Sequence, residues 1–400
     1  MKTIFRNLLS VLRRFKMATT LNVLGLSVAF AAFIVIMIQL DYDRNFDRSY
    51  PDADAIYRVE VGFGNKYQGI INRPLANLFI ESSPHIVAGS LVNPWGGNMF
   101  FSVEKDGVQH NFEEKTSSVY PDFPRIFSFD MVEGSADALN EPEKVLIPQS
   151  MARRLFGDEP AVDRLLKGME DWTVTVGGVY RDLPRNSAIE NVIYQKLSDK
   201  ENIQNWGNWN YVFFIRVDSP ENAKGLFDNF KRITDPSVMS SLGDDFGWES
   251  TTFNLRLTSL PEVHYTTDVT YDRTPKASRQ TLLVLFAIAI VIIVIAGINF
   301  TNFSTALTPM RIKSINTQKV LGGDEGVIRR ALLAEAILTS FVAFLIALGM
   351  IYLLPLTPVA SMIEADLSLA AHPLILAGTG VIALLTGLLA GLYPALYMTS

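Results

Sequence analysis

The stretch Thr281–Phe300, TLLVLFAIAIVIIVIAGINF, decides the fold class of this 400-residue chain. It lies inside an uncharged run from Gln280 to Met310. A helix of about 20 apolar residues crosses the roughly 30 Å hydrocarbon core of a bilayer. Three other runs are similarly apolar, so we expect four membrane-spanning helices at about 20–40, 281–303, 333–354 and 373–396.

The composition agrees with partial burial in a membrane. Hydrophobic residues make up 48% of the chain and charged residues 19%, whereas about a quarter of the residues in soluble domains are charged. The chain has no cysteine, which excludes disulfides, cysteine-ligated zinc and thiol nucleophiles. Residues 41–300 carry a net charge of −11, from 25 basic and 36 acidic residues, which argues against nucleic-acid binding.

The basic residues beside the spans predict the orientation. Five precede the first span, and five more lie between the second and third: Arg311, Lys313, Lys319, Arg329 and Arg330. The loop between the third and fourth spans has none. We therefore expect a multi-pass protein of the cell inner membrane, with a cytoplasmic N-terminus and with residues 41–279 and 355–372 outside the cytoplasm.

Two features near the N-terminus have alternative interpretations. Residues 1–19 read as a basic amphipathic helix lying in the cytoplasmic interface, although a plain positively charged anchor fits nearly as well. The first span could be a cleaved signal peptide. Its length and the lack of a small-residue cleavage site before Asp41 favour a retained helix at 20–40.

The external block, residues 41–279, reads as mixed α/β with one or two subdomains. Alternating apolar residues predict strands at 55–62, 143–148, 172–180, 209–217 and 252–259. Helices are expected at 74–82, 149–156 and 220–233. The predicted fold is thus an α-helical membrane protein with four transmembrane helices and a large mixed α/β extracytoplasmic domain between helices 1 and 2.

We find no motif for catalysis, cofactor binding or metal binding. His85, His110 and His264 are scattered without ligand spacing, and each is interpreted as an ordinary surface or core histidine. No GxxxxGK[ST] phosphate loop occurs. We therefore expect no enzyme activity and no directly bound cofactor. Any ATP-driven work needs ATP and Mg²⁺ on a partner subunit.

Residues 308–330 are the most informative cytoplasmic segment. The segment begins polar and basic, breaks at Gly322-Gly323, and restarts as an amphipathic helix with Asp324 and Glu325 at its start. Such a helix–Gly–helix projection can dock on a cytosolic partner, although an interfacial helix on lipid is an equal alternative. In the fourth span, Gly387 and Gly391 form a GxxxG pattern that permits close helix packing.

Taken in order, these segments resemble the MacB/FtsX-like ABC transporter permeases over nearly the whole chain. The matching pieces are LNVLGLSVAFAAFIV and DYDRNFD at the first span; AIYRV, FDMVEGSADAL, VLIPQSMARRLFGDEP and VTVGGVYRDLPRNS in the external block; and INFTNFSTALTPMRIKSINTQKVLGG and LLAGLYPAL near spans 2 and 4. The stretch SINTQKVLGG departs from the family pattern before KxLG.

The resemblance implies a domain plan and a set of partners. It implies a MacB-like periplasmic core domain at 41–279, an FtsX-like domain at 280–400, and a coupling loop at 308–330 contacted by a cytosolic ABC ATPase. The implied ATPase contact comprises Arg311, Lys313, Lys319, Val320, Leu321, Gly322 and Gly323. Other expected partners are the lipid bilayer, a second copy or second permease half, and a periplasmic protein, without nucleic acid.

The implied function is coupling of ATP hydrolysis on the partner to movement of the external domain, for export, extraction or mechanotransmission. Because such permeases often continue beyond the fourth span, we expect these residues to be either the first half of a longer, duplicated permease or a unit that dimerises. The alternative function is a transmembrane sensor, or a regulator of a cell-envelope hydrolase.

Overall fold

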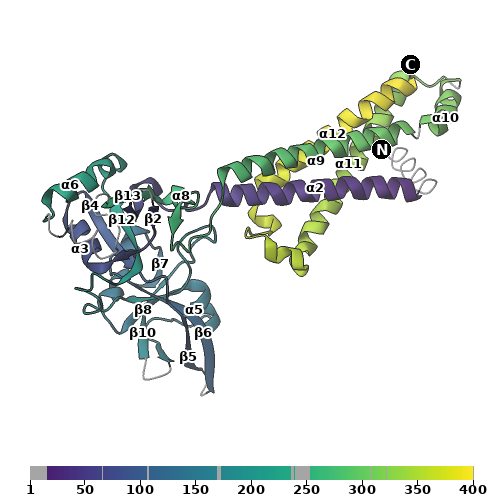
Figure 1. Ribbon diagram of the computed structural model, residues 1–400. Helices are drawn as coiled ribbons and strands as arrows, with labels where there is room; N and C mark the ends of the chain where they lie inside the picture. Colours follow the sequence, from purple (N-terminus) through teal and green to yellow (C-terminus); the bar gives the residue numbers. More distant parts are fainter. Residues whose placement is uncertain are drawn as a thin grey trace. The chain divides into compact units, whose positions relative to one another are not determined.

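The computed structural model describes residues 16–64, 66–105, 108–168, 173–235, 238, 253–306, 308–320 and 322–399. The chain forms two compact units, which are best described separately. The helical unit is built from the segment that ends at Arg44 and the segment that begins at Arg279, and the inserted domain spans Asn45–Ser278 (Figure 1). Most of the N-terminal segment expected to be amphipathic, residues 1–15, lies outside the described residues.

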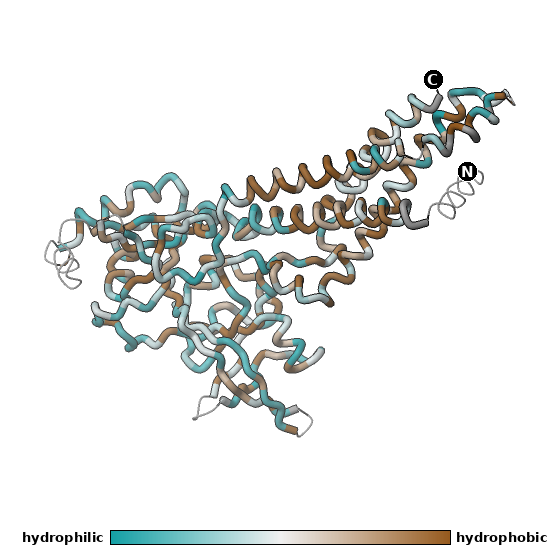
Figure 2. Tube along the Cα trace, turned by 45° about the vertical axis from the view of Figure 1, so that its right-hand side comes forward, coloured by the Kyte–Doolittle hydropathy of each residue, from teal (hydrophilic) through white to brown (hydrophobic). Residues whose placement is uncertain are grey.

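Four long helices dominate the helical unit: α2 (Lys16–Arg44), α9 (Arg279–Ala306), α11 (Glu325–Leu353) and α12 (Pro373–Thr399). All four are long and apolar enough to cross a membrane. Figure 2 shows the hydrophobic residues gathered along these helices, whereas hydrophilic residues are spread over the inserted domain. The helices coincide with the four predicted spans and extend beyond them at one or both ends, because polar flanking residues continue the helical backbone.

Between these helices lie shorter ones. Helix α10 (Thr308–Val320) follows α9, and the 3₁₀ helices η4 (Leu354–Leu356), η5 (Pro358–Met362) and η6 (Leu369–Ala371) join α11 to α12. The core of the unit is formed by buried side chains of α2, α9, α11 and α12, among them Phe30, Ile34, Phe300, Ala347 and Ala383. Small residues on α11 and α12 let these two helices approach closely, and Ser340 Oγ donates to the Ala383 carbonyl at 2.6 Å.

The inserted domain contains two groups of strands. In the first group, six strands form a closed circuit in the order β5, β6, β11, β8, β10, β9 and back to β5, with β7 added to β10. Their bounds are β5 (Asn98–Lys105), β6 (Val108–Val119), β7 (Met131–Gly134), β8 (Lys144–Pro148), β9 (Leu165–Gly168), β10 (Thr173–Tyr180) and β11 (Ile193–Lys196). Helix α5 (Gln149–Phe156) packs its apolar side against their buried residues.

In the second group, β4, β12 and β1 form the centre of a sheet, and β2, β3, β13 and β14 complete it. The bounds are β1 (Ile56–Phe63), β2 (Lys66–Gln68), β3 (Ile71–Asn72), β4 (Ile86–Val92), β12 (Trp209–Val217), β13 (Phe253–Ser259) and β14 (Val269–Thr270). Helices α3 (Arg73–Glu81) and α6 (Leu226–Ile233) bury Phe79 and Phe230 in one core cluster, where the Phe79 ring packs against both Phe230 and Phe213 of β12.

The remaining short helices fill the connections: η1 (Ala53–Ala55), α4 (Phe123–Ile126), η2 (Ala136–Asn140), η3 (Pro220–Gly225) and α8 (Leu260–Val263). The predicted fold class is confirmed, with a large mixed α/β domain between the first and second apolar helices. All five predicted strands are present to within one residue at each end. The helix expected at 220–233 is instead a 3₁₀ turn followed by α6, because Gly225 interrupts the regular helix.

Candidate functional site: the two connections of the inserted domain

The inserted domain joins the helical unit through two chain segments. The first connection (residues 45–50) follows α2, and the second connection (residues 268–278) precedes α9. These residues are the covalent links from α2 and α9 to the inserted domain. Both connections are fixed by unusually dense polar and aromatic contacts, and these contacts form the candidate site.

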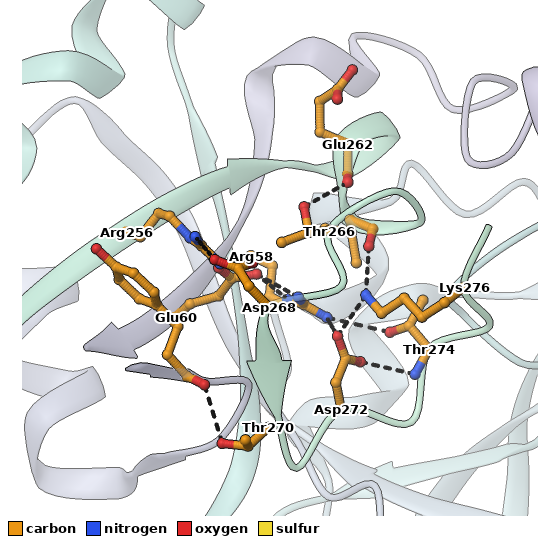
Figure 3. Close-up of polar contacts among 12 residues, drawn as sticks. Arg58, Glu60, Arg256, Glu262, Thr266, Asp268, Thr270, Asp272, Thr274 and Lys276 are labelled. Carbon is orange, nitrogen blue, oxygen red and sulfur yellow. Dashed lines mark hydrogen bonds and ion pairs between the residues drawn. The ribbon is translucent and has the colours of Figure 1, made fainter. Parts of the chain in front are cut away.

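The second connection is held by an ion-pair cluster of three cations and three carboxylates: Arg58, Glu60, Arg256, Asp268, Asp272 and Lys276 (Figure 3). Arg58 and Glu60 lie two residues apart on β1, so their side chains share one face of the strand. Both are buried, at 1% and 0% exposure. Arg256 lies opposite Glu60 on the neighbouring strand β13.

The contacts in this cluster reach from the sheet to the second connection. Arg58 Nη1 donates to Asp272 Oδ2 at 2.6 Å, and its Nε donates to Glu60 Oε1 at 3.0 Å. Arg256 donates to Glu60 Oε2 at 2.6 Å and binds Asp268 with two hydrogen bonds of 2.8 and 2.9 Å. Lys276 Nζ lies 2.6 Å from Asp272 Oδ2. The sheet and the second connection are therefore joined by charge-assisted hydrogen bonds.

The electrostatics of the cluster favour the ionised form of Asp272. Burial alone would raise the pKa of the Asp272 carboxyl, but Arg58 and Lys276 outweigh burial and place this pKa below its usual value. Burial lowers the pKa of the Lys276 ammonium, and the hydrogen bond to Asp272 opposes that change. A buried ion pair is weak evidence for net stability, yet removal of one partner leaves an uncompensated charge. The cluster therefore penalises any displacement of the second connection from β1.

The first connection is linked to the second through His264, which follows α8 and lies just before the second connection. The rings of Phe46 and His264 are nearly parallel, with centroids 3.8 Å apart, and both side chains are 1% exposed. His264 Nδ1 lies 2.7 Å from the Pro275 carbonyl, and the Ala277 amide donates to the His264 carbonyl at 3.0 Å. His264 thus links the chain that enters the domain to the chain that leaves it.

Asp47 fixes the first connection to residues 186–189. Its amide donates to the Asn186 carbonyl at 2.8 Å, and its Oδ1 accepts from the Ala188 amide at 2.9 Å. Tyr50 Oη and Ser187 Oγ are hydrogen-bonded at 2.7 Å. Asp47 has φ 57°, a left-handed conformation that aspartate and asparagine adopt more readily than most residues. Burial raises the pKa of the Asp47 carboxyl to about 7, opposed by Ser187, Ala188 and the charge of His264.

The residues expected to contact an ATPase lie at the junction of α10 and α11. Val320 is 87% exposed, Gly322 has φ 84°, and Lys319 Nζ donates to Glu325 Oε1 at 2.8 Å across the break. Asp324 caps α11 by accepting from the Val327 amide at 3.0 Å. Gly323 lies in the same break; Arg311 and Lys313 lie on α10, but their side chains and Leu321 are outside the described residues.

Gly387 and Gly391 lie where α12 packs on α11. A Cβ atom on Gly387 would come within 2.7 Å of Ile337 Cα, and one on Gly391 within 2.6 Å of Ala336 Cβ. Both distances are too short for any side chain, so only glycine allows this approach.

The three histidines have different environments. His85 Nδ1 lies 2.8 Å from Asp218 Oδ2 on the surface, His110 lies on β6, and His264 belongs to the stack described above. Among the described residues no group of three or more histidine or acidic side chains could hold a metal ion. Sequence reasoning placed His264 as an ordinary residue because its partner Phe46 is more than two hundred positions away. The ion-pair cluster was missed for the same reason, although Arg58 and Glu60 on one face of an apolar strand were a usable signal.

Comparisons with known proteins agree with this architecture. Residues 19–233 match the MacB-like periplasmic core domain, and residues 286–400 match the FtsX-like permease C-terminal domain. No curated protein matches the chain.

Three solved structures are similar in part. A domain of a permease protein from Porphyromonas gingivalis is 24% identical, covering 59% of this chain and 98% of its own, with a TM-score of 0.43. The periplasmic region of MacB from Actinobacillus actinomycetemcomitans is 12% identical, covering 54% and 92%, with a TM-score of 0.36. The extracellular domain of the noncanonic ABC-type transporter YknZ from Gram-positive bacteria is 11% identical, covering 51% and 99%, with a TM-score of 0.33.

The four apolar helices and the two matched domains together indicate a multi-pass inner membrane protein. The chain belongs to the MacB/FtsX-like family of ABC transporter permeases.

Proposed function

We propose that this chain is the membrane subunit of an ATP-driven complex, in which a separate cytosolic ABC ATPase moves the inserted domain through α2 and α9. The observation that carries the proposal is the construction of the two connections. Each leads directly into an apolar helix, and the Phe46–His264 stack joins them. Displacements of α2 and α9 would therefore act on one rigid region rather than on two independent loops.

In this proposal ATP and Mg²⁺ are bound by the ATPase, and the chain itself binds neither. The work done is export, extraction or mechanotransmission. A second copy of the chain, or a second permease half, would complete the membrane part, and a periplasmic protein is a further candidate partner. Helix α9 supports a partner within the membrane, because only 11% of its most apolar window is buried in the chain itself.

The orientation places α10 in the cytoplasm and the inserted domain on the other side. The chain has no cysteine, so single substitutions report position without background. We expect Lys200→Cys, in the inserted domain, to react with a membrane-impermeant maleimide in intact spheroplasts. Asn316→Cys, on α10, should react only after the membrane is permeabilised. The reverse pattern would contradict the orientation.

The ATPase contact is proposed at the break between α10 and α11. Ile315 of α10 packs against Ile328 and Leu332 of α11, so the two helices form a hairpin whose tip carries Lys319, Val320, Gly322 and Gly323. The tip is exposed at Val320. A polar hairpin closed by a glycine turn is a compact shape for insertion into a groove of a cytosolic subunit.

Gly322→Leu should weaken association with the ATPase, because a left-handed backbone at φ 84° strains a branched side chain and the turn must change. The measurement is affinity purification of the tagged full-length chain in a gentle detergent, with quantitative mass spectrometry of the co-purified ATPase. Gly349→Leu, on α11 with open space around its Cα, is the control and should retain the ATPase. Equal recovery with both variants would contradict the assigned contact.

A further inference from the structure

A cavity of about 360 Å³ lies within the inserted domain. Its size is within the range of small-molecule sites, about 300–1,000 Å³. A second hollow of about 380 Å³ adjoins it and shares the wall formed by Arg185, Ser187 and Glu190.

The walls of the cavity are the segments anchored to those connections. One wall is formed by Ser187, Ala188 and Ile189, which are held by Asp47 and Tyr50 of the first connection. The opposite wall is formed by residues 272–275 of the second connection. Figure 3 shows Asp272 in that wall turned toward Arg58 and Lys276, so this segment is fixed from behind.

The floor of the cavity is apolar. Val92 and Val212, which pair across β4 and β12, line it and are half-buried. They pack against the core cluster that contains Phe123, Tyr194 and Phe214, whose side chains are buried at 0%, 2% and 3% exposure. The Tyr194 hydroxyl already donates to the Glu190 carbonyl at 2.5 Å. The floor therefore favours an apolar body in the ligand.

The carboxylates of the cavity wall are paired with cations, and Arg273 supplies the positive charge that the proposal uses. The two carboxylates are occupied, since Glu190 pairs with Lys115 at 2.8 Å and Asp272 pairs with Arg58 and Lys276. Arg185 and Arg273 also line the cavity.

Arg273 is held in place by groups that leave its charge available. Its guanidinium lies 4.0 Å from the Trp95 ring centroid, and Nη1 donates to the Pro94 carbonyl at 2.9 Å. Among the described residues these are its polar and ring contacts, and neither is an anion. A guanidinium fixed by a ring and a carbonyl, with N–H groups remaining, is suited to bind a carboxylate through two hydrogen bonds.

We propose that this cavity binds a ligand with an apolar body and a terminal carboxylate, the body on Val92 and Val212 and the carboxylate on Arg273. Such a group occurs in a free fatty acid and at the C-terminus of a polypeptide that ends in an apolar residue. The site requires only the inserted domain, so a test of ligand binding does not depend on the proposed ATPase partner.

The test uses the full-length chain in amphipol and isothermal titration calorimetry. The probes are octanoate, for the fatty-acid source, and N-acetyl-phenylalanine, for the polypeptide source. Octanamide and N-acetyl-phenylalaninamide have the same bodies without the charge. We expect saturable binding of at least one acid. The corresponding amide should bind with an affinity lower by roughly tenfold or more, because a charge-assisted hydrogen bond is lost. The acid that binds more tightly identifies the source.

Arg273→Gln should weaken binding of the acid by a similar factor and leave binding of the amide unchanged. Arg181→Gln is the matched control, because Arg181 is an exposed arginine paired with Asp130 and does not line the cavity. The comparison of acid and amide on the unmodified chain needs no variant and so does not depend on variant folding. Equal binding of acid and amide, or no saturable binding of either acid, would overturn the proposal.

Discussion

Replacement of Arg58 by methionine is expected to lower the free energy of unfolding of the inserted domain by about 3 kcal/mol, as for other buried ion pairs that lose one partner. Arg58 is 1% exposed and contacts both Glu60 and Asp272. Without it, two buried carboxylates must share the remaining cations Arg256 and Lys276. The change would be measured by denaturant unfolding of the full-length chain, followed by tryptophan fluorescence.

Two further variants separate this explanation from a loss of packing. Arg58→Lys keeps the charge but has a single ammonium in place of the guanidinium fork that contacts two carboxylates, so we expect an intermediate loss. Arg181→Met removes an exposed arginine from its ion pair with Asp130 and should leave the unfolding midpoint unchanged. If Arg58→Met were as stable as Arg181→Met, the cluster would not hold the second connection in place.

The second large effect is a pH dependence carried by Asp47. Its pKa is raised from 3.8 to about 7 in the folded chain, mainly by burial. Between these values the folded state binds a proton that the unfolded state has released, so stability falls as pH rises from about 4 to about 7. Each pKa unit corresponds to about 1.4 kcal/mol, so going from pH 5 to pH 8 should cost about 2–3 kcal/mol at this residue.

Asp47→Asn should remove this part of the pH dependence. Asparagine tolerates the left-handed backbone, and its amide oxygen can still accept from the Ala188 amide. Because other groups also titrate, the quantity to compare is the difference in unfolding free energy between the two chains at pH 5 and pH 8. We expect the unfolding free energy of the asparagine variant, relative to that of the unmodified chain, to be higher at pH 8 than at pH 5. A difference that does not change with pH would show that Asp47 is ionised at both values.

The fold was predictable where the signal is local. Four uncharged runs predict four long helices because a bilayer requires about 20 apolar residues in sequence. Strands such as β1, β8 and β12 were predicted from their alternating or continuous apolar residues. The short strands β2, β3 and β14, with two or three residues each, carry no such pattern. β2 and β3 form beside the longer strands β1 and β12, and β14 is added to β2.

The site was less predictable because its contacts join distant segments. Arg58 and Asp272 are separated by 214 positions, and Phe46 and His264 by a similar distance. No spacing rule relates such residues within one sequence. The pKa of Asp47 depends in the same way on its burial against residues 186–189. The turn between α10 and α11 could be read locally, because Gly322 and the capping residue Asp324 mark the turn and the start of α11.

The central claim is that ATP hydrolysis on a partner moves the inserted domain through the two connections. The most direct test is a distance measurement between spin labels on Lys200→Cys, in the inserted domain, and Ser368→Cys, in the connection between α11 and α12, in the purified complex with its ATPase. Trapping with ATP and vanadate should shift this distance distribution relative to the nucleotide-free complex, and Arg58→Met should reduce the shift. An unchanged distribution in a complex that hydrolyses ATP would contradict the account.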